Sequence, residues 1–174
     1  MSVKSIQKAE SIVPKGVNDY VDSVELFMLK EMVENGDYQV IECPLNHTFT
    51  PGLYSRRITM PAGSRVTSKI HKTEHQFAVL KGKVTVRTFV GDRFYDVELQ
   101  AGDSGITMPG TRRILIIHDE SDCVWITFHA TDKTTPEEVE ADIIEYHVNP
   151  MFEKDYLEFV KNKNNINSQL IENK

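Results

Sequence analysis

The sequence predicts a mainly β protein with helices at both ends. About nine short segments rich in Val, Ile, Thr, Phe and Tyr follow one another between residues 38 and 130. Turn signals such as Pro51-Gly52, Gly91-Asp92 and Pro109-Gly110 separate these segments at a spacing of roughly ten residues. Helical periodicity is confined to the regions before residue 36 and after residue 132. This order of elements predicts a β-sandwich, jelly roll or barrel flanked by helices.

The N-terminal segment, residues 1–36, is predicted to be a loosely attached arm followed by one amphipathic helix. Residues 1–16 form the arm, which ends in Pro14-Lys15-Gly16. From Asn18 to Asn35 the apolar residues recur at helical spacing, with Asn18 as the N-cap and Gly36 as the stop signal.

The barrel segment is predicted to span residues 37–131. Within it, the stretch from Pro44 to Pro51 is rich in turn-forming residues and is predicted to be a loop. The predicted strands are Tyr38 to Cys43, Leu53 to Met60, Arg65 to Ile70, Gln76 to Leu80, Lys83 to Val90, Phe94 to Leu99, Ser104 to Met108, Arg112 to His118 and Cys123 to Ala130.

Helices are predicted again over residues 132–163. Thr135-Pro136-Glu137-Glu138 supplies an N-cap, a proline at the first helical position and a capping-box glutamate, so a helix should run from there to about His147. A second helix is expected from about Pro150 to Asn162, because its apolar residues share one side. Residues 164–174 are mostly polar and are predicted to form a disordered tail.

Composition excludes several classes of protein. The longest uncharged apolar run is about five residues, far below the roughly 18 that a membrane span requires. Lys4, Lys8 and Glu10 lie where a signal peptide needs an apolar region, so the expected location is the cytoplasm. Cys43 and Cys123 match no metal-binding pattern and are predicted to be reduced thiols.

Charge is distributed unevenly along the chain. The net charge of −6 argues against binding to nucleic acid. Between Arg56 and Arg113, however, there are 11 basic and five acidic residues, and all seven arginines lie in this stretch. Because arginine is suited to a bidentate grip on carboxylate or phosphate, this distribution favours an anion-binding site. The alternative is that these arginines only cover the outer face of a sheet or pair with acidic residues of the flanking segments.

Two motifs combine turn residues with polar side chains at fixed spacing. The first runs from Pro61-Ala62-Gly63 through His71 and His75 to Gly82, and the second runs from Gly102-Asp103 to Pro109-Gly110-Thr111-Arg112-Arg113. Together they resemble the two motifs of the cupin superfamily over roughly residues 54 to 130. The resemblance implies a cupin-type jelly-roll barrel, here with an N-terminal helix and C-terminal helices. The layout is most similar to uncharacterised cupins of phage and bacterial genomes, and for a phage protein the cytoplasm would be that of the host.

The resemblance also assigns the positions that hold a metal ion in this family. It places Lys69, His71, His75 and Arg113 there, so two of the four positions are cationic. Their charges would repel a metal ion, which favours an anion site without a cofactor. The alternative is a divalent transition metal on His71 and His75, completed by water or by one of three further side chains: Glu74, His118 and His129. The last two are each expected to be structural residues of the barrel rather than ligands.

The spacing of the two motif histidines sets a geometric condition. In one extended strand, His71 and His75 would lie about 13 Å apart, too far to share a ligand. They converge only if Lys72-Thr73-Glu74 turns the chain between neighbouring strands. Strand alternation places Thr67 and His71 on the same face as Lys69.

The predicted function is binding of an anionic small molecule in a basic pocket of the barrel. The ligand is expected to be nucleotide-like, phosphorylated or a carboxylate, and the protein is expected to bind or sequester it. Two enzymatic alternatives stay open: a metal-free isomerase or lyase with His71 or His75 as the base, and a metal-dependent dioxygenase or isomerase. The terminal helices offer apolar faces that predict a homodimer or larger homo-oligomer. The predicted ligand-binding residues are Arg56, Arg57, Lys69, His71, His75 and Arg113.

Overall fold

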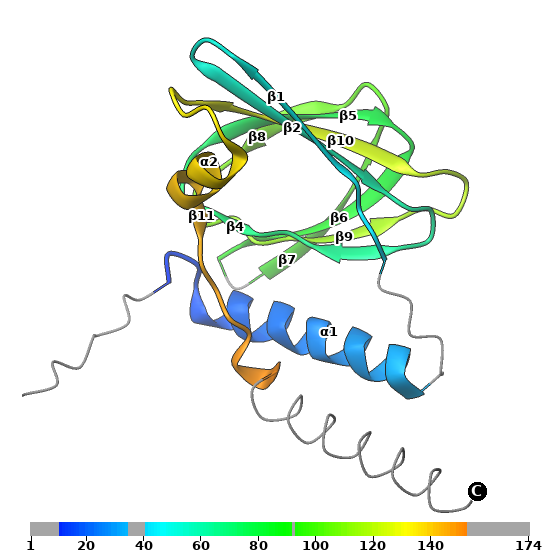
Figure 1. Cartoon of the computed structure of the whole chain (residues 1–174). Coiled ribbons are helices and arrows are strands. Elements are labelled where there is room, and N and C mark those ends of the chain that lie inside the picture. The colour runs from blue at the N-terminus through cyan, green and yellow to red at the C-terminus, as the bar shows by residue number, and fades with distance from the viewer. Residues whose placement is uncertain (1–10, 35–40, 92, 153–174) are drawn as a thin grey trace, which may run out of the picture.

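The core of the structure is a barrel of two antiparallel sheets that face each other (Figure 1). The computed structural model describes residues 11–34, 41–91 and 93–152. One sheet has the strand order β1-β2-β10-β5-β8, the other has the order β3-β9-β6-β7, and a two-stranded ladder joins β4 to β11. The barrel strands are β1 (Leu45–Thr50), β2 (Leu53–Met60), β3 (Arg65–Thr67), β4 (Ile70–His71), β5 (His75–Lys81), β6 (Lys83–Val90), β7 (Arg93–Gln100), β8 (Ser104–Thr107), β9 (Ile114–Ile117) and β10 (Cys123–Ala130).

Most predicted strands are confirmed, and one is wrong. β2, β6 and β10 have the predicted bounds, and the predicted strand from Arg65 to Ile70 is divided between β3 and β4. Residues 41–43 carry no regular structure, and the start of that predicted strand lies outside the described residues. The prediction of a loop from Pro44 to Pro51 is wrong, because β1 lies within it and pairs with β2 along its whole length. Pro44 and Pro51 bound this strand and do not interrupt its hydrogen bonds.

Alternating side chains of the two sheets fill the barrel. Along β10 every second residue is buried, from Cys123 to His129, and β10 lies between β2 and β5. The same alternation in β2 turns Tyr54 and Met60 inward. The interior therefore receives apolar and polar residues from the same strands. The buried core comprises Met60, Phe77, Val79, Val84, Val86, Leu115, Ile117, Cys123 and Trp125.

The turn between β5 and β6 requires a glycine. Gly82 has a φ of +78°, and a Cβ atom there would lie 2.4 Å from the carbonyl oxygen of Asp122. A side chain would therefore meet backbone in a conformation that L-residues rarely adopt. The first cupin-like motif ends at this glycine, and its conformation gives a physical reason for glycine at that position.

Helix α1 (Lys15–Glu34) lies against the outside of the barrel (Figure 1). Val13 belongs to the predicted loose arm, yet it is buried, so the described end of this arm is packed against the barrel. Residues 1–10 lie outside the described residues. The helix, the arm and the barrel share a small core of Val13, Val17, Val21, Ile70 and Ile114.

A buried ion-pair network fixes α1 to the barrel. Arg112, only 4% exposed, pairs with Asp22 at 2.7 Å and with Glu25 at 3.1 Å. Nε2 of His147 lies 2.9 Å from the same Asp22 carboxylate. The prediction of Asn18 as the N-cap is wrong, because the helix begins one turn earlier and the Asn18 side chain accepts a hydrogen bond from Arg112.

Helix α2 (Pro136–Ile143) follows the barrel and has the predicted N-terminus. Oγ1 of Thr135 caps it by accepting from the backbone N–H of Glu138. The helix does not extend to about His147, because Ile144 is extended and β11 (Ile144–Glu145) pairs with β4. Residues 150–152 are helical, whereas the rest of the predicted second helix and the predicted tail lie outside the described residues. Within the described ranges, no helix is long and apolar enough to cross a membrane.

Candidate functional site

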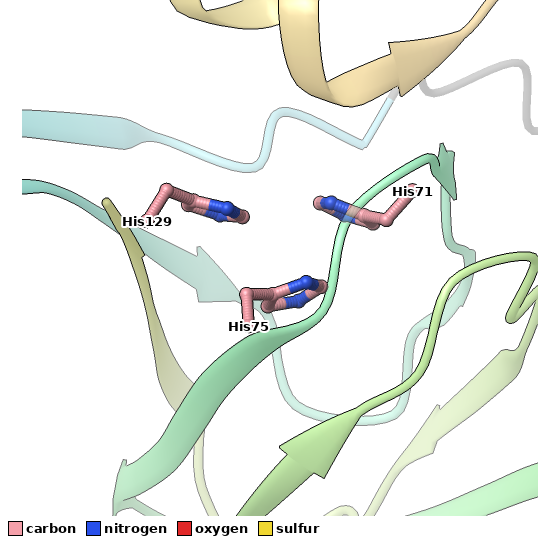
Figure 2. Close-up of side chains that lie close together, drawn as sticks. All are labelled: His71, His75 and His129. Carbon is pink, nitrogen blue, oxygen red and sulfur yellow. The ribbon is translucent and has the colours of Figure 1, made fainter. Parts of the chain in front are cut away.

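Three histidines converge where β4, β5 and β10 meet (Figure 2). His71, His75 and His129 are all buried, and one potential ligand atom of each lies within 4.8 Å of the others. The ring centroids of His71 and His75 are 4.1 Å apart, and that of His129 lies 4.5 Å from His75. The bend at residues 72–74 produces this approach, as the spacing of the two motif histidines required.

Hydrogen bonds define which ring nitrogen is free in two of these histidines. The Thr127 hydroxyl donates to the backbone carbonyl of Arg56, so its oxygen accepts from Nε2–H of His129 at 3.1 Å. Nδ1 of His129 is then left with a lone pair, and it is buried without a hydrogen-bond partner. Nδ1 of His75 lies 3.3 Å from the Thr73 carbonyl, which can only accept, so its Nε2 carries the lone pair. Nδ1 of His71 is also buried without a partner.

All three imidazoles are neutral at physiological pH. Burial is the main cause that lowers the pKa of His71 to about 2, and interactions with His75, Arg56, His129 and Arg113 lower it further. Burial and the neighbouring His75 lower the pKa of His129 to about 3. The pKa of His75 is lowered as well, mainly by burial. A neutral imidazole presents one lone pair, which is the form that binds a metal ion or accepts a proton.

A cavity of about 210 Å³ adjoins the histidine cluster. His71 and His75 belong to its lining, whereas His129 lies outside the lining and contacts the other two rings. His71 and His75 therefore belong both to the histidine cluster, which could bind a metal ion, and to the lining of the cavity. The remaining lining residues are Leu45, Arg56, Ile58, Met60, Val66, Thr67, Ser68, Lys69, Thr107, Thr111, Arg113, Leu115, Trp125 and Thr127.

Two arginines of the cavity have no acidic partner within the described ranges. Nη1 of Arg113 donates to Oγ1 of Thr107 at 3.1 Å, while its Nε is buried without a partner. Arg56 reaches the same cavity, and no described carboxylate pairs with it. By contrast, Arg87 pairs with Asp96 on the barrel surface. Burial lowers the pKa of both cavity arginines, because their charge has lost solvent without gaining a counter-ion.

The six predicted ligand-binding residues differ in whether they line the cavity and in whether their charge is already paired. Alternation along β2 leaves Arg57 exposed and outside the cavity lining, on the strand face opposite Arg56. Lys69 lines the cavity but forms an ion pair with Glu140 of α2, so its charge is already matched. The other four, Arg56, His71, His75 and Arg113, are brought together without an acidic partner among the described residues.

His129 was expected to be a structural residue of the barrel, but it belongs to the histidine cluster. The signal was present, because His129 shares strand parity with Trp125 and Thr127, and both of these line the cavity. Of the other proposed metal ligands, His118 is hydrogen-bonded to Thr85 and Glu74 is exposed, and neither belongs to the cluster.

Comparison with known proteins assigns the barrel. The cupin domain model matches residues 56–129, which run from β2 to the end of β10 and contain all three clustered histidines. Residues 56–129 are a cupin domain. The predicted cupin-type jelly-roll barrel with flanking helices is thereby confirmed. No curated protein matches the sequence.

Several solved structures resemble this chain at low sequence identity. Oxalate oxidase in complex with glycolate has a TM-score of 0.47 and 14% identity, and the match covers 56% of this chain and 55% of that one. Oxalate decarboxylase from Lactobacillus farciminis has a TM-score of 0.48 and 10% identity, over 60% of this chain and 34% of that one. An uncharacterised double-stranded β-helix protein from Klebsiella pneumoniae has a TM-score of 0.44 and 17% identity, over 54% and 81%. This chain thus spans about half of the oxalate oxidase and a third of the decarboxylase.

Proposed function

We propose that the cupin domain binds a small anion beside a divalent transition metal. The observation that carries this proposal is that three neutral, buried histidines adjoin a cavity lined by two half-buried arginines without acidic partners among the described residues. Orphaned buried polar atoms are costly, and a metal ion and an anion would satisfy them together.

The histidine cluster fits a metal ion on chemical grounds. Imidazole nitrogens bind zinc, iron, nickel and copper, with metal–nitrogen distances of about 2.0–2.1 Å for zinc. His71, His75 and His129 would hold the ion, with Nε2 of His75 and Nδ1 of His129 as the available lone pairs. In the sequence, the positive charge of Lys69 argued against a bound metal ion. In the structure, an ion pair with Glu140 offsets this charge. The ion would supply a Lewis acid that polarises an oxygen atom of the bound anion.

Thr127 should act as a positioning residue for His129. Replacing it by valine removes the acceptor that holds Nε2–H of His129, so the other tautomer and other ring orientations become accessible. We expect Thr127→Val to weaken Co²⁺ binding by about 10- to 100-fold, as the loss of comparable outer-shell partners does. Thr127→Ser should restore most of the affinity. The measurement is titration of the metal-free protein with Co²⁺, followed by visible absorption.

The matched control for Thr127 lies in the other sheet. Oγ1 of Thr85 is 2.9 Å from Nε2 of His118, which is the same pairing of residue types away from the cluster. Thr85→Val should leave the Co²⁺ affinity unchanged. Equal affinity in the Thr127→Val and wild-type proteins would contradict the positioning role.

The arginines should bind the anion, and Arg56 and Arg57 offer a neighbouring pair for testing this. Arg56→Ala should weaken binding of acetate and inorganic phosphate by about tenfold or more, because hydrogen bonds to charged groups contribute on the order of 1.5–3 kcal/mol and Arg56 is half-buried. Arg57→Ala should change it less than about twofold, because Arg57 lies outside the cavity lining. Ligand-observed NMR titrations suit such weak probes. Equal losses in both variants would place the anion on the barrel surface.

A further inference from the structure

The cavity has an extensive apolar wall. Six of its lining residues are apolar, and they come from both sheets: Leu45, Ile58, Met60, Val66, Leu115 and Trp125. Its volume of about 210 Å³ is somewhat larger than that of an engineered cavity of about 150 Å³ that binds benzene. The space therefore suits one ring or a branched alkyl group together with a small polar group.

Four of the five hydroxyl groups that line the cavity form at least one hydrogen bond within the protein. Ser68 accepts from the backbone N–H of Arg113, Thr107 accepts from its guanidinium, and the Thr111 hydroxyl donates to a backbone carbonyl. Thr127 is engaged by His129 and by the Arg56 carbonyl. Thr67 is the lining hydroxyl for which the described residues provide no hydrogen bond. Ser68 and Thr107 keep an O–H to donate, but a sugar or ribose carries several hydroxyls that need partners, and the six apolar residues of the lining offer none.

Arg113 presents one side of its guanidinium without a protein partner. Its Nη1 is used by Thr107, whereas Nε, together with Nη2, has no hydrogen-bond acceptor among the described residues. Two N–H groups side by side match the two oxygens of a planar carboxylate. The guanidinium also lies 5.5 Å from the centroid of the Phe77 ring, which limits the directions in which it can turn.

We infer that the ligand is a compact carboxylate with an apolar body about the size of a benzene ring. This inference rests on the anion site proposed above and narrows it to one chemical class. The carboxylate binds Arg113 and Arg56, and the apolar body packs against the six-residue wall. A nucleotide, one of the ligands considered from the sequence, exceeds this cavity in size and in hydrogen-bonding demand.

A set of related probes tests the inference on the unmodified full chain. Isothermal titration calorimetry with benzoate, acetate, benzamide and AMP varies the apolar body, the charge and the size separately. We expect benzoate to bind at least about tenfold more tightly than acetate, because the ring loses its contact with water. It should also bind at least about tenfold more tightly than benzamide, the uncharged isostere, and more tightly than AMP.

A variant of Arg113 tests whether its two neighbouring N–H groups bind the two oxygens of the carboxylate. Arg113→Lys keeps the charge but lacks the paired N–H groups, so it should weaken benzoate binding about tenfold or more. Arg57→Lys is the matched control and should bind benzoate like the wild type. An unchanged benzoate affinity in the Arg113→Lys protein would overturn the assignment of the carboxylate to Arg113.

The probe set also separates failure of the inference from failure of the proposed function. Acetate binding as tightly as benzoate, or AMP binding most tightly, overturns the apolar, compact ligand class while an anion site remains. Benzamide binding as tightly as benzoate overturns the anion site itself, and the inference fails with it.

Discussion

His129→Ala should reduce transition-metal affinity at least about a hundredfold. His129 supplies one of three nitrogens in the cluster, and its Nδ1 is buried with no other partner. Structural zinc sites bind with apparent free energies of about 10 kcal/mol or more, so an equal third of that corresponds to more than a hundredfold in affinity. The measurements are the metal content of the purified proteins by elemental analysis and Zn²⁺ titration of the metal-free proteins.

His118→Ala provides the control for this prediction. His118 is also a strand-end histidine of the barrel, but it is bonded to Thr85 and lies outside the cluster, so its removal should leave metal affinity unchanged. If His129→Ala retained full metal affinity, the cluster would not be a metal site. That result would favour the metal-free isomerase or lyase, in which His71 or His75 is available as a neutral base.

Much of the fold and part of the site could be predicted from the residue pattern along the strands. The bounds of β2, β6 and β10 follow directly from their β-branched and aromatic residues and the turns around them. Parity along β2 could also have separated Arg56 from Arg57, because Tyr54, Ile58 and Met60 share the side of Arg56 and favour an inward face. β1 was missed because its two flanking prolines were interpreted as parts of one loop.

Other features depend on contacts that no local pattern encodes. His129 joins the cluster only because β10 lies between β2 and β5 in the sheet, next to the strand that begins at His75. The end of α2 is set by pairing of Ile144 with His71, two residues far apart in the chain. The charge of Lys69 opposes a metal ion when the sequence is taken alone, whereas in the structure Glu140 forms an ion pair with it. Each of these features depends on contacts between residues far apart in the chain, and a single sequence does not reveal such contacts.

Loss of Arg112 should have the largest effect on stability. We expect Arg112→Leu to lower the free energy of unfolding by about 3–5 kcal/mol, because removal of one partner leaves Asp22, 2% exposed, as an uncompensated buried charge. Partial compensation by His147, whose Nε2 is 2.9 Å from the same carboxylate, would keep the loss at the lower end of this range. Urea unfolding of the metal-free protein measures the effect without a contribution from bound metal.

The comparison variant is Arg87→Leu, because Arg87 forms a bidentate pair with Asp96 on the surface and, within the described ranges, makes only one hydrogen bond to α1, to the Tyr20 hydroxyl. Exposed pairs contribute about 0.2–1 kcal/mol, so the two arginines should differ severalfold in their effect. Replacing both members of the more buried pair, as Arg112→Leu with Asp22→Leu, removes the Asp22 charge, leaves only the more exposed Glu25 without Arg112, and should destabilise less than the sum of the single variants. If Arg112→Leu cost no more than Arg87→Leu, the attachment of α1 would depend mainly on its other contacts, such as the apolar packing of Val17 and Val21. A large loss that the double variant relieves would instead show that charge pairing fixes the helix to the strand that begins two residues after Arg112.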